Sequence, residues 1–342
     1  MKKILNILAA ALLLTACEKQ IDIDIENSGS MVVVKATNEA GSPMVVDLTY
    51  SRPTFGSFYV RYGEDYFPKV TDATVTLCVE GGATETATRN GGTYTFAHIP
   101  QTGEELKLTV SVPGHDEVTS TATVPAMPAI SAIDTNNIGN DYEYGYYSPA
   151  LNTTINFTIT DPTETADFYS IRLREVASTV ITQYDNNRNI ISRDISVDDN
   201  YMWFSCTDYL LVNSTDIEDV LDVEDPTASS TYYGREMLFT DATINGQSHR
   251  IKITPEYGFT YEYIDYDADY VEHTTTVTLY LEVTALTRDV YLYRQTMNNY
   301  DYDEILSFFS EPTQLHSNIN GGIGIFGVST KTVNKVFTVT LQ

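Results

Sequence analysis

The sequence predicts an all-β protein with two β-sandwich-like domains in tandem, the second carrying one or two short helices. The chain of 342 residues holds 25 tyrosines against a single tryptophan, and threonine and valine are also abundant, which favours strands. Short segments in which apolar and polar residues alternate recur along most of the chain. Turn residues separate these segments at short intervals, a spacing typical of sandwiches.

The N-terminus predicts export and lipid attachment. Lys2 and Lys3 precede an apolar stretch, residues 4–14, that is too short to span a bilayer as a helix. Leu14-Thr15-Ala16-Cys17 follows, with the small residues and the thiol that a lipoprotein cleavage site requires. We therefore expect a signal peptide over residues 1–16 and an anchor of several acyl chains on Cys17, which holds the protein to a membrane.

Residues 17–30 are expected to form a tether. Acidic residues soon after Cys17 resemble the signal that sends lipoproteins of Bacteroidetes-type bacteria to the cell surface, although Lys19 and Gln20 interrupt it. The expected location is the outer membrane, lipid-anchored, with the cell-surface face favoured over the periplasmic face.

Residues 31–125 are expected to form an immunoglobulin-like β-sandwich. Val75, Leu77 and Val79 alternate with polar residues, which predicts a strand with one buried face. Asn90-Gly91-Gly92 lies between two alternating segments and predicts a hairpin turn. The strand candidates of this region are residues 31–34, 45–50, 73–80, 84–89, 93–97, 106–112 and 118–124.

Residues 126–342 are expected to form a larger β-rich domain. Thr287 is a plausible N-cap of one helix, because Leu286, Val290, Tyr293 and Met297 then fall on one side. A second, weaker helical stretch is predicted over residues 209–220. The strand candidates are residues 153–160, 168–176, 190–195, 235–239, 249–253, 274–284 and 331–341.

Composition and motifs argue against several function classes. With 47 acidic and 20 basic residues the formal net charge is −27, so binding to DNA or RNA is not expected. The five histidines are scattered and no G-x-S-x-G motif occurs, so we predict no enzyme, no catalytic residues, no metal ligands and no cofactor. Gly322 to Gly327 match G-x-G-x-x-G, but a strand pattern follows where a dinucleotide site needs a helix. These glycines therefore predict a tightly packed turn.

Two further residue groups could form sites. Cys78 and Cys206 lie far apart in sequence and are expected to be separate thiols. Asp265 to Asp269 and Asp301 to Glu304 are acidic enough for calcium, yet they lack the glycine and distal glutamate of an EF-hand. A solvated loop or strand edge is the favoured reading of both acidic segments.

Tyrosine-rich segments are the candidate interface. Tyrosine offers a flat apolar face with a polar tip, which suits protein contacts and stacking on sugars. Ordinary strand and loop surface remains the alternative for each segment. The candidate interface residues are Tyr142, Tyr144, Tyr146, Tyr147, Tyr261, Tyr263 and Tyr266.

Near the C-terminus, Glu311-Pro312 followed by the run from Ser317 to Gly327 resembles the ending of a Bacteroidetes lipoprotein family, the domain-of-unknown-function family DUF4249. The resemblance extends over nearly the whole chain after the signal. Shorter matches are Cys17-Glu18-Lys19 with Ile21-Asp22, Val70 to Val75, Pro113-Gly114-His115, Val124-Pro125, Phe239-Thr240-Asp241 before Ile244-Asn245-Gly246, and Leu286-Thr287. The resemblance implies an outer-membrane or surface lipoprotein, of a kind often encoded beside TonB-dependent receptors, and it assigns no catalytic residue.

The predicted function is therefore binding. We expect an outer-membrane or surface lipoprotein, held by lipid on Cys17 and accessory to a TonB-dependent transporter, with an outer-membrane β-barrel as its protein partner. The alternatives are a glycan-binding surface lipoprotein and an adhesin or appendage subunit. Both remain open at this point, because aromatic segments and tandem sandwiches fit either.

Overall fold

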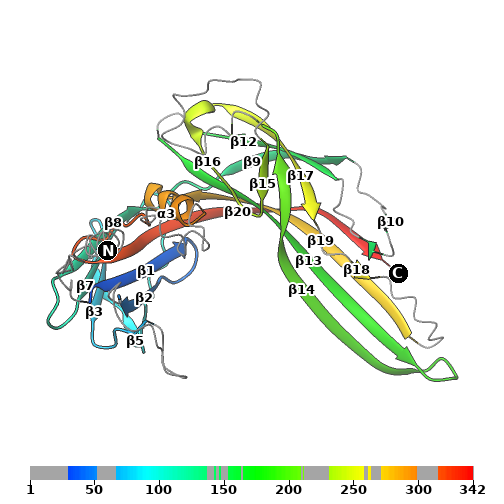
Figure 1. The fold of residues 1–342 in the computed structure, drawn as a ribbon, viewed down its shortest axis with the longest axis horizontal. Helices are drawn as coiled ribbons and strands as arrows, with labels where there is room; N and C mark the ends of the chain where they lie inside the picture. The colour runs from blue at the N-terminus through cyan, green and yellow to red at the C-terminus, as the bar shows by residue number, and fades with distance from the viewer. Residues whose placement is uncertain are drawn as a thin grey trace, which may run out of the picture.

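The architecture was analysed in a computed structural model. It describes residues 30–51, 67–136, 142–143, 146–147, 153–162, 165–208, 211, 231–257, 261–262, 271–298 and 315–341. Strands dominate, and a large sheet and a separate four-stranded sheet form a β-sandwich-like arrangement, so the predicted all-β class is confirmed. Figure 1 shows an elongated molecule, with the first strands at one end and a long hairpin projecting from the other.

The N-terminal region is a sandwich of two sheets. One layer is the β5-β6-β2-β1 end of the 13-stranded sheet, and the other is the separate sheet of order β4-β3-β7-β8. Their apolar faces enclose one core, which includes Val34, Leu48, Leu77 and Leu108. The strands are β1 (Val32–Glu39), β2 (Val45–Tyr50), β3 (Thr74–Val79), β4 (Thr84–Thr86), β5 (Thr88–Asn90), β6 (Thr93–Thr95), β7 (Glu105–Ser111) and β8 (Val118–Thr123).

Local sequence patterns account well for this sandwich. In β7 the apolar residues Leu106, Leu108 and Val110 are buried, while Glu105 and Lys107 are exposed, as alternation requires. Asn90 pairs with Thr93, so Gly91 and Gly92 form a two-residue hairpin loop at the predicted place.

The second region is a large curled sheet. Its strands follow the order β20-β19-β13-β14-β17-β12-β9, and β15 and β16 pair with β14 and β13. Apolar side chains from β12 and β17 meet those of β13, β14 and β19 in a second core, for example Phe157, Leu173, Phe204 and Leu281. The elements are β9 (Ala129–Asn136), β10 (Tyr142–Glu143), β11 (Tyr146–Tyr147), β12 (Thr154–Thr160), β13 (Phe168–Tyr184), β14 (Ile190–Cys206), β15 (Tyr232–Gly234), β16 (Met237–Thr240), η2 (Asp241–Thr243), β17 (Ser248–Tyr257), β18 (Tyr261–Glu262), β19 (Val271–Leu286), α3 (Arg288–Asn298) and β20 (Ile323–Leu341).

Strands β13 and β14 are much longer than the sequence predicted. Each has 17 residues, against the expected segments 168–176 and 190–195. Only their inner halves contribute to the second core, and the outer halves project as the hairpin visible in Figure 1. In β13 the predicted segment is the buried inner part. In β14 the predicted segment is the exposed outer part, and the sequence missed the inner part, where Met202, Phe204 and Cys206 are buried.

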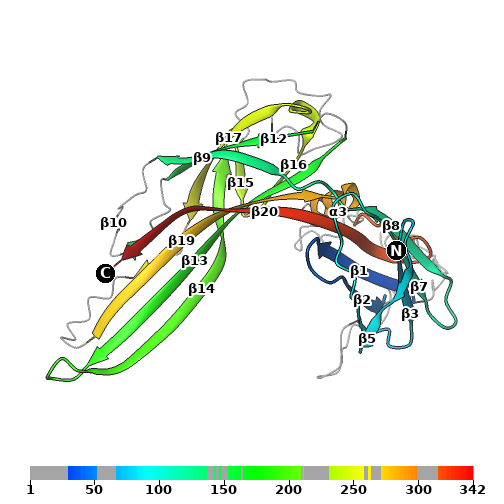
Figure 2. The same ribbon diagram turned by 180° about the vertical axis from the view of Figure 1, so that it is seen from behind.

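Strand β20 joins the two regions. Its first part, Ile323 to Ser329, pairs parallel with β1, and its remainder, from Ser329 onward, pairs antiparallel with β19. Phe326 and Val328 are thereby buried in the N-terminal core. Figure 2 shows β20 running as one continuous strand between the two ends of the molecule. The predicted domain boundary at residue 125 stays a prediction. The structure adds that β20, although C-terminal, belongs to the N-terminal sandwich as well as to the second region.

The glycine-rich motif lies mostly within the start of β20 rather than in the predicted turn, and it has the predicted packing role. Strand rather than helix follows Gly327, so the second requirement of a dinucleotide fingerprint is not met. Gly324 has a φ of +117°, and a Cβ at this position would overlap the carbonyl oxygen of Val34 on β1. At Gly327 a Cβ would lie 2.6 Å from the hydroxyl oxygen of Thr287. These glycines allow close approach of neighbouring backbone and side chains.

The side chain of Asn318, just before the glycines, makes the two backbone hydrogen bonds that a neighbouring strand would make. The Asn318 side-chain amide donates to the Phe326 carbonyl at 2.7 Å, and its oxygen accepts from the Phe326 N–H at 2.9 Å. The same amide donates to Asp289 of α3 at 3.2 Å. Asn318 therefore holds the start of β20 against the helix, in the segment that carries the family resemblance.

The predicted helix is present as α3, and its predicted inner side is correct for Leu286, Val290 and Tyr293 but wrong for Met297. Thr287 precedes its first residue, and the Thr287 carbonyl accepts from the Tyr291 N–H at 3.0 Å. Val290 and Tyr291 are buried, whereas Met297, predicted on the inner side, is 42% exposed. The helix packs beside Leu286 and Ile325, so it turns toward the start of β20, and only its first turns are covered. The second predicted helical stretch, residues 209–220, lies outside the described residues except for Leu211.

The two remaining cysteines are separate thiols, as predicted. Cys78 on β3 and Cys206 on β14 are both free, and Cys206 is buried. Burial raises the pKa of the Cys206 thiol to about 11, so this group is a protonated, unreactive core residue at neutral pH.

Replacing Gly324 tests the junction of the two regions. We expect Gly324→Ala to lower the free energy of unfolding by on the order of 3 kcal/mol or more, because a left-handed backbone and a steric overlap with β1 combine. Chemical denaturation measures this change. Gly41→Ala is the matched control, since Gly41 also has a positive φ of +88° but nothing within 4 Å of a Cβ. Equal losses in both variants would contradict a special role for Gly324.

Candidate functional site

The predicted site residues divide into two sets. Cys17, Tyr144, Tyr263 and Tyr266 lie outside the described residues. Tyr142 is on β10, Tyr146 and Tyr147 are on β11, and Tyr261 is on β18. The acidic segments 265–269 and 301–304 also lie outside the described part of the chain.

The structure brings two tyrosine-rich segments together. Strands β10, β11 and β18 form a three-stranded antiparallel sheet in which Tyr142 pairs with Tyr147 and Tyr147 pairs with Tyr261. In Figure 1, β10 and β18 lie toward the end of the molecule where β20 finishes. Residues more than a hundred positions apart in sequence therefore share one small sheet, a proximity that no local pattern could indicate.

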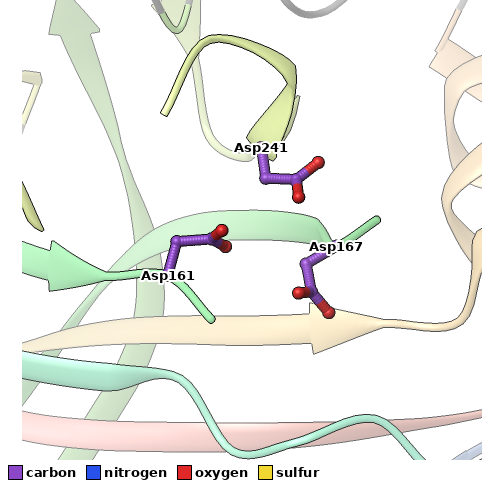
Figure 3. A group of neighbouring side chains, drawn as sticks. All are labelled: Asp161, Asp167 and Asp241. Atoms are coloured by element: carbon purple, nitrogen blue, oxygen red, sulfur yellow. The ribbon is translucent and has the colours of Figure 1, made fainter. Parts of the chain in front are cut away.

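A second site is a cluster of three carboxylates that the sequence did not reveal. Asp161 follows β12, Asp167 precedes β13 and Asp241 opens η2, and one carboxylate oxygen from each lies within 4.8 Å of the others. Figure 3 shows the three side chains converging from these separate segments. The pairing of Phe168 with Thr240 brings the residues next to them into contact, and the Asp241 N–H donates to the Asp167 carbonyl at 3.1 Å.

Neutral donors surround these carboxylates. The Tyr169 hydroxyl donates to Asp161 at 2.7 Å, and the Gly246 N–H donates to its second oxygen at 3.0 Å. The Thr165 hydroxyl donates to Asp167 at 2.6 Å, and the Asn245 amide donates to Asp241 at 3.1 Å. In the part of the chain that the structure describes, no lysine or arginine forms an ion pair with the cluster.

Burial and mutual repulsion make ionisation of the cluster costly. Asp161 and Asp241 are buried, at 3% and 4% exposure. Burial raises the pKa of Asp167 and of Asp241, and the nearby Asp161 carboxylate raises both further. Such an arrangement can share a proton or hold a divalent cation through hard oxygen ligands. Among the described residues, these three are the ones that could hold a metal ion.

Asp167 also lines a hollow of about 800 Å³ between the two regions of the molecule. One wall comes from the β4-β3-β7-β8 sheet, with Glu80 and Glu105, and the other from the start of α3. A hydrogen bond between the Glu80 and Glu105 carboxyl groups raises the pKa of Glu105. The hollow is therefore predominantly acidic, although Lys107 and Arg288 also line it.

The single tryptophan belongs to a small exposed aromatic pair. Trp203 and Tyr233 are 36% and 47% exposed, and their ring centroids are 5.2 Å apart with the planes inclined by 30°. The Arg235 guanidinium carbon lies 5.5 Å from the centre of the Trp203 ring. One face of the indole is thus occupied by a cation–π contact.

The outer half of β14 presents an unusual apolar surface. Ile190, Ile191, Ile195 and Val197 are each between 61% and 66% exposed. Single exposed aliphatic residues are ordinary, but Ile190, Ile195 and Val197 share one face of a projecting strand and form a patch of the kind that marks interaction sites. The sequence predicts a strand over residues 190–195, but no local pattern distinguishes an exposed aliphatic residue from one that a distant strand covers.

The comparisons with known proteins give a family and no function. The family model described as "Domain of unknown function (DUF4249)" matches residues 18–335, so the chain belongs to this family, as the resemblance implied. No curated protein matches it. No helix in the described residues is both long and apolar enough to cross a membrane.

One similar solved structure comes from a study of the promiscuous specificity of carbohydrate-binding modules from the β-sandwich superfamily. It shares 9% identity and covers 75% of this chain and 97% of its own, with a TM-score of 0.19. A TM-score this low supports no argument about the ligand of this chain.

Removing one charge tests the carboxylate cluster. Because the pKa of Asp167 is raised in the folded state, its stabilising protonated form is lost as the pH rises through that pKa. We expect Asp167→Asn to raise the melting temperature at pH 7.5 in chelator, with the gain shrinking toward pH 3 to 4. Thermal melts across this pH range measure the effect.

Asp185→Asn is the control of opposite sign. Hydrogen bonds from the Asn189 side chain and backbone lower the pKa of Asp185, so its contribution is present at neutral pH and lost in acid. This variant should lose a little stability at pH 7.5. If Asp167→Asn melts at a lower temperature than the wild type in chelator, ionisation of the carboxylate cluster does not destabilise the folded protein as expected. A calcium-dependent rise in the wild type that Asp167→Asn abolishes would identify a bound cation.

Proposed function

We propose that the protein is a lipid-anchored outer-membrane or surface lipoprotein that acts by binding, as an accessory to a TonB-dependent transporter. Lipid on Cys17 would hold it to the membrane, and an outer-membrane β-barrel would be its protein partner. The lipoprotein signal supports the anchor, and the family resemblance supports the link to transporters. The observation that carries a binding role is the exposed aliphatic patch on the outer half of β14.

The shape of the β13–β14 hairpin suits this role. At about 3.3 Å per residue, strands of this length extend over roughly 55 Å, and their outer halves stand clear of the second core. Four exposed aliphatic residues on such a projection lose contact with water when a partner covers them, which favours association. A free hairpin of this kind would otherwise be an aggregation risk that natural proteins avoid.

A non-catalytic role fits the chemistry of the described residues. His249 and His316 are each engaged by a carboxylate, Asp208 and Asp289, at 2.6 and 2.8 Å. His98 pairs in the same way with Glu104. The carboxylates of the cluster accept hydrogen bonds from Tyr169, Thr165, Asn245 and the Gly246 backbone, and no cysteine or histidine of the described residues bonds to them. We therefore propose no enzymatic activity.

Affinity purification tests the proposal. A tagged full-length chain, isolated from detergent-solubilised outer membranes, should retain a β-barrel transporter. Cys17→Ser should be absent from the membrane fraction, because the thiol that carries the lipid is removed. Recovery of the chain without any β-barrel protein would count against the accessory role, and membrane retention of Cys17→Ser would count against the anchor.

Glycan binding is the second candidate, favoured by the Trp203–Tyr233 pair. Aromatic faces stack on sugar rings, and both side chains are accessible. It ranks second because the two rings are inclined to each other and Arg235 lies over the indole.

A glycan array with the full-length chain tests this alternative. If sugars bind here, Trp203→Ala should abolish the signal while Tyr280→Ala, on the ring that faces Arg174, leaves it unchanged. No binding at millimolar glycan would eliminate this function.

A further inference from the structure

We propose that the outer edge of β14, residues 190–201, accepts an extended partner strand in which apolar and basic residues alternate, by β-strand addition. The proposal rests on the binding function above and specifies its surface and its recognition chemistry. Strand addition supplies main-chain hydrogen bonds for affinity, and alternate side chains supply specificity.

The edge is open in the described structure. Strand β14 pairs with β13 from Ile190 to Met202, and it pairs with β17 only from Trp203 onward. From Ile190 to Met202, the edge of β14 that faces away from β13 therefore has no strand partner among the described residues. Alternate N–H and carbonyl groups of this edge point away from β13, so they form a template for one more strand.

One face of this edge has an apolar centre, Ile195 and Val197, with Arg193 and Asp199 at its two ends. Ile195 lies opposite Val180 on β13, and Val180 lies opposite Thr274 on β19, so the three share a face. Val197 follows on the same face, two residues along. Near the tip, Ile190, Val180 and Arg193 help to line a cavity of about 270 Å³ on the sheet surface. Apolar side chains of an added strand would lie beside Ile195 and Val197 and cover them.

The opposite face of the same edge is acidic. Asp194 and Asp198 alternate with Ile195 and Val197, so they point to the other side of the sheet. Both are exposed, and neither forms an ion pair among the described residues, whereas neighbouring Asp199 pairs with Arg174 at 3.0 Å. Lysine or arginine at every second position of the added strand would lie beside these two free carboxylates.

Charge argues against a second copy of the chain as the occupant. Antiparallel pairing of two β14 edges would place the Asp194 and Asp198 carboxylates of both copies on one face, where like charges destabilise the pairing. A formal net charge of −27 adds repulsion at longer range. The same charges attract a basic strand, so the edge discriminates between the two occupants.

Designed peptides test the proposal with the full-length chain in detergent. The probes are a twelve-residue peptide alternating valine and lysine, one alternating valine and glutamate, and one with the valines and lysines in separate blocks. We expect the alternating valine–lysine peptide to bind about tenfold or more tightly than the other two. Hydrogen exchange should slow at amides of residues 190–201, which side-chain docking alone would not cause.

Variants assign the two faces. Asp194→Lys/Asp198→Lys should reverse the preference toward the valine–glutamate peptide, and Ile195→Ser/Val197→Ser should weaken binding of the valine–lysine peptide by about tenfold or more. Val333→Ser on β20 is the matched control, because Val333 is also an exposed aliphatic residue, at 44%. Thermal melts confirm that each variant is folded.

Several outcomes would overturn the inference. These are equal binding of all three peptides, no binding, protection on β20 instead of β14, or an unchanged preference in the charge-reversal variant. The proposed function fails separately. Peptide binding at β14 without a β-barrel partner in membranes would overturn the accessory role alone. Recovery of a β-barrel that Ile195→Ser/Val197→Ser leaves undiminished would overturn this inference alone.

Discussion

The structure depends on one strand, β20, whose backbone pairs with strands of both regions. Strand β20 pairs parallel with β1 and antiparallel with β19, and its side chains enter the N-terminal core. The Ser329 hydroxyl donates to the Asn38 carbonyl, across 291 positions of sequence. The glycines at its start let it approach β1 closely, and Asn318 holds it to α3. Disturbing this strand therefore affects both cores together.

The remaining features follow from how the second region is built on that strand. Strands β19, β13 and β14 continue the sheet outward from β20, each pairing with the one before. Near α3, β13 also pairs with β16, and this pairing gathers Asp161, Asp167 and Asp241. Farther out, no other described element covers this sheet, and β14 is its edge among the described strands. The same strands thus carry a buried acidic cluster at one end and an exposed apolar edge at the other.

The sequence predicted features that depend on neighbouring residues and missed contacts between residues far apart in the chain. Alternation in Leu106, Leu108 and Val110 gave a strand and its buried face, and Asn90-Gly91-Gly92 gave a hairpin, because both depend on neighbours along the chain. The carboxylate cluster joins residues 80 positions apart, and Tyr147 pairs with Tyr261. Periodicity determines which way a side chain points, but it does not determine which distant strand lies beside it. The inner side of α3 was partly mispredicted for the same reason, since only its first turns are covered.

The pairing of β1 with β20 bears on how the chain would be exported. If the signal at residues 1–16 directs secretion, the N-terminus leaves the cytoplasm first and the glycine-rich end leaves last. The N-terminal sandwich would lack β20 until translocation is complete, and apolar side chains of its other strands would stay exposed until then. A chain that ends before β20 would lack the strand that pairs with β1, and its N-terminal sandwich would stay incomplete.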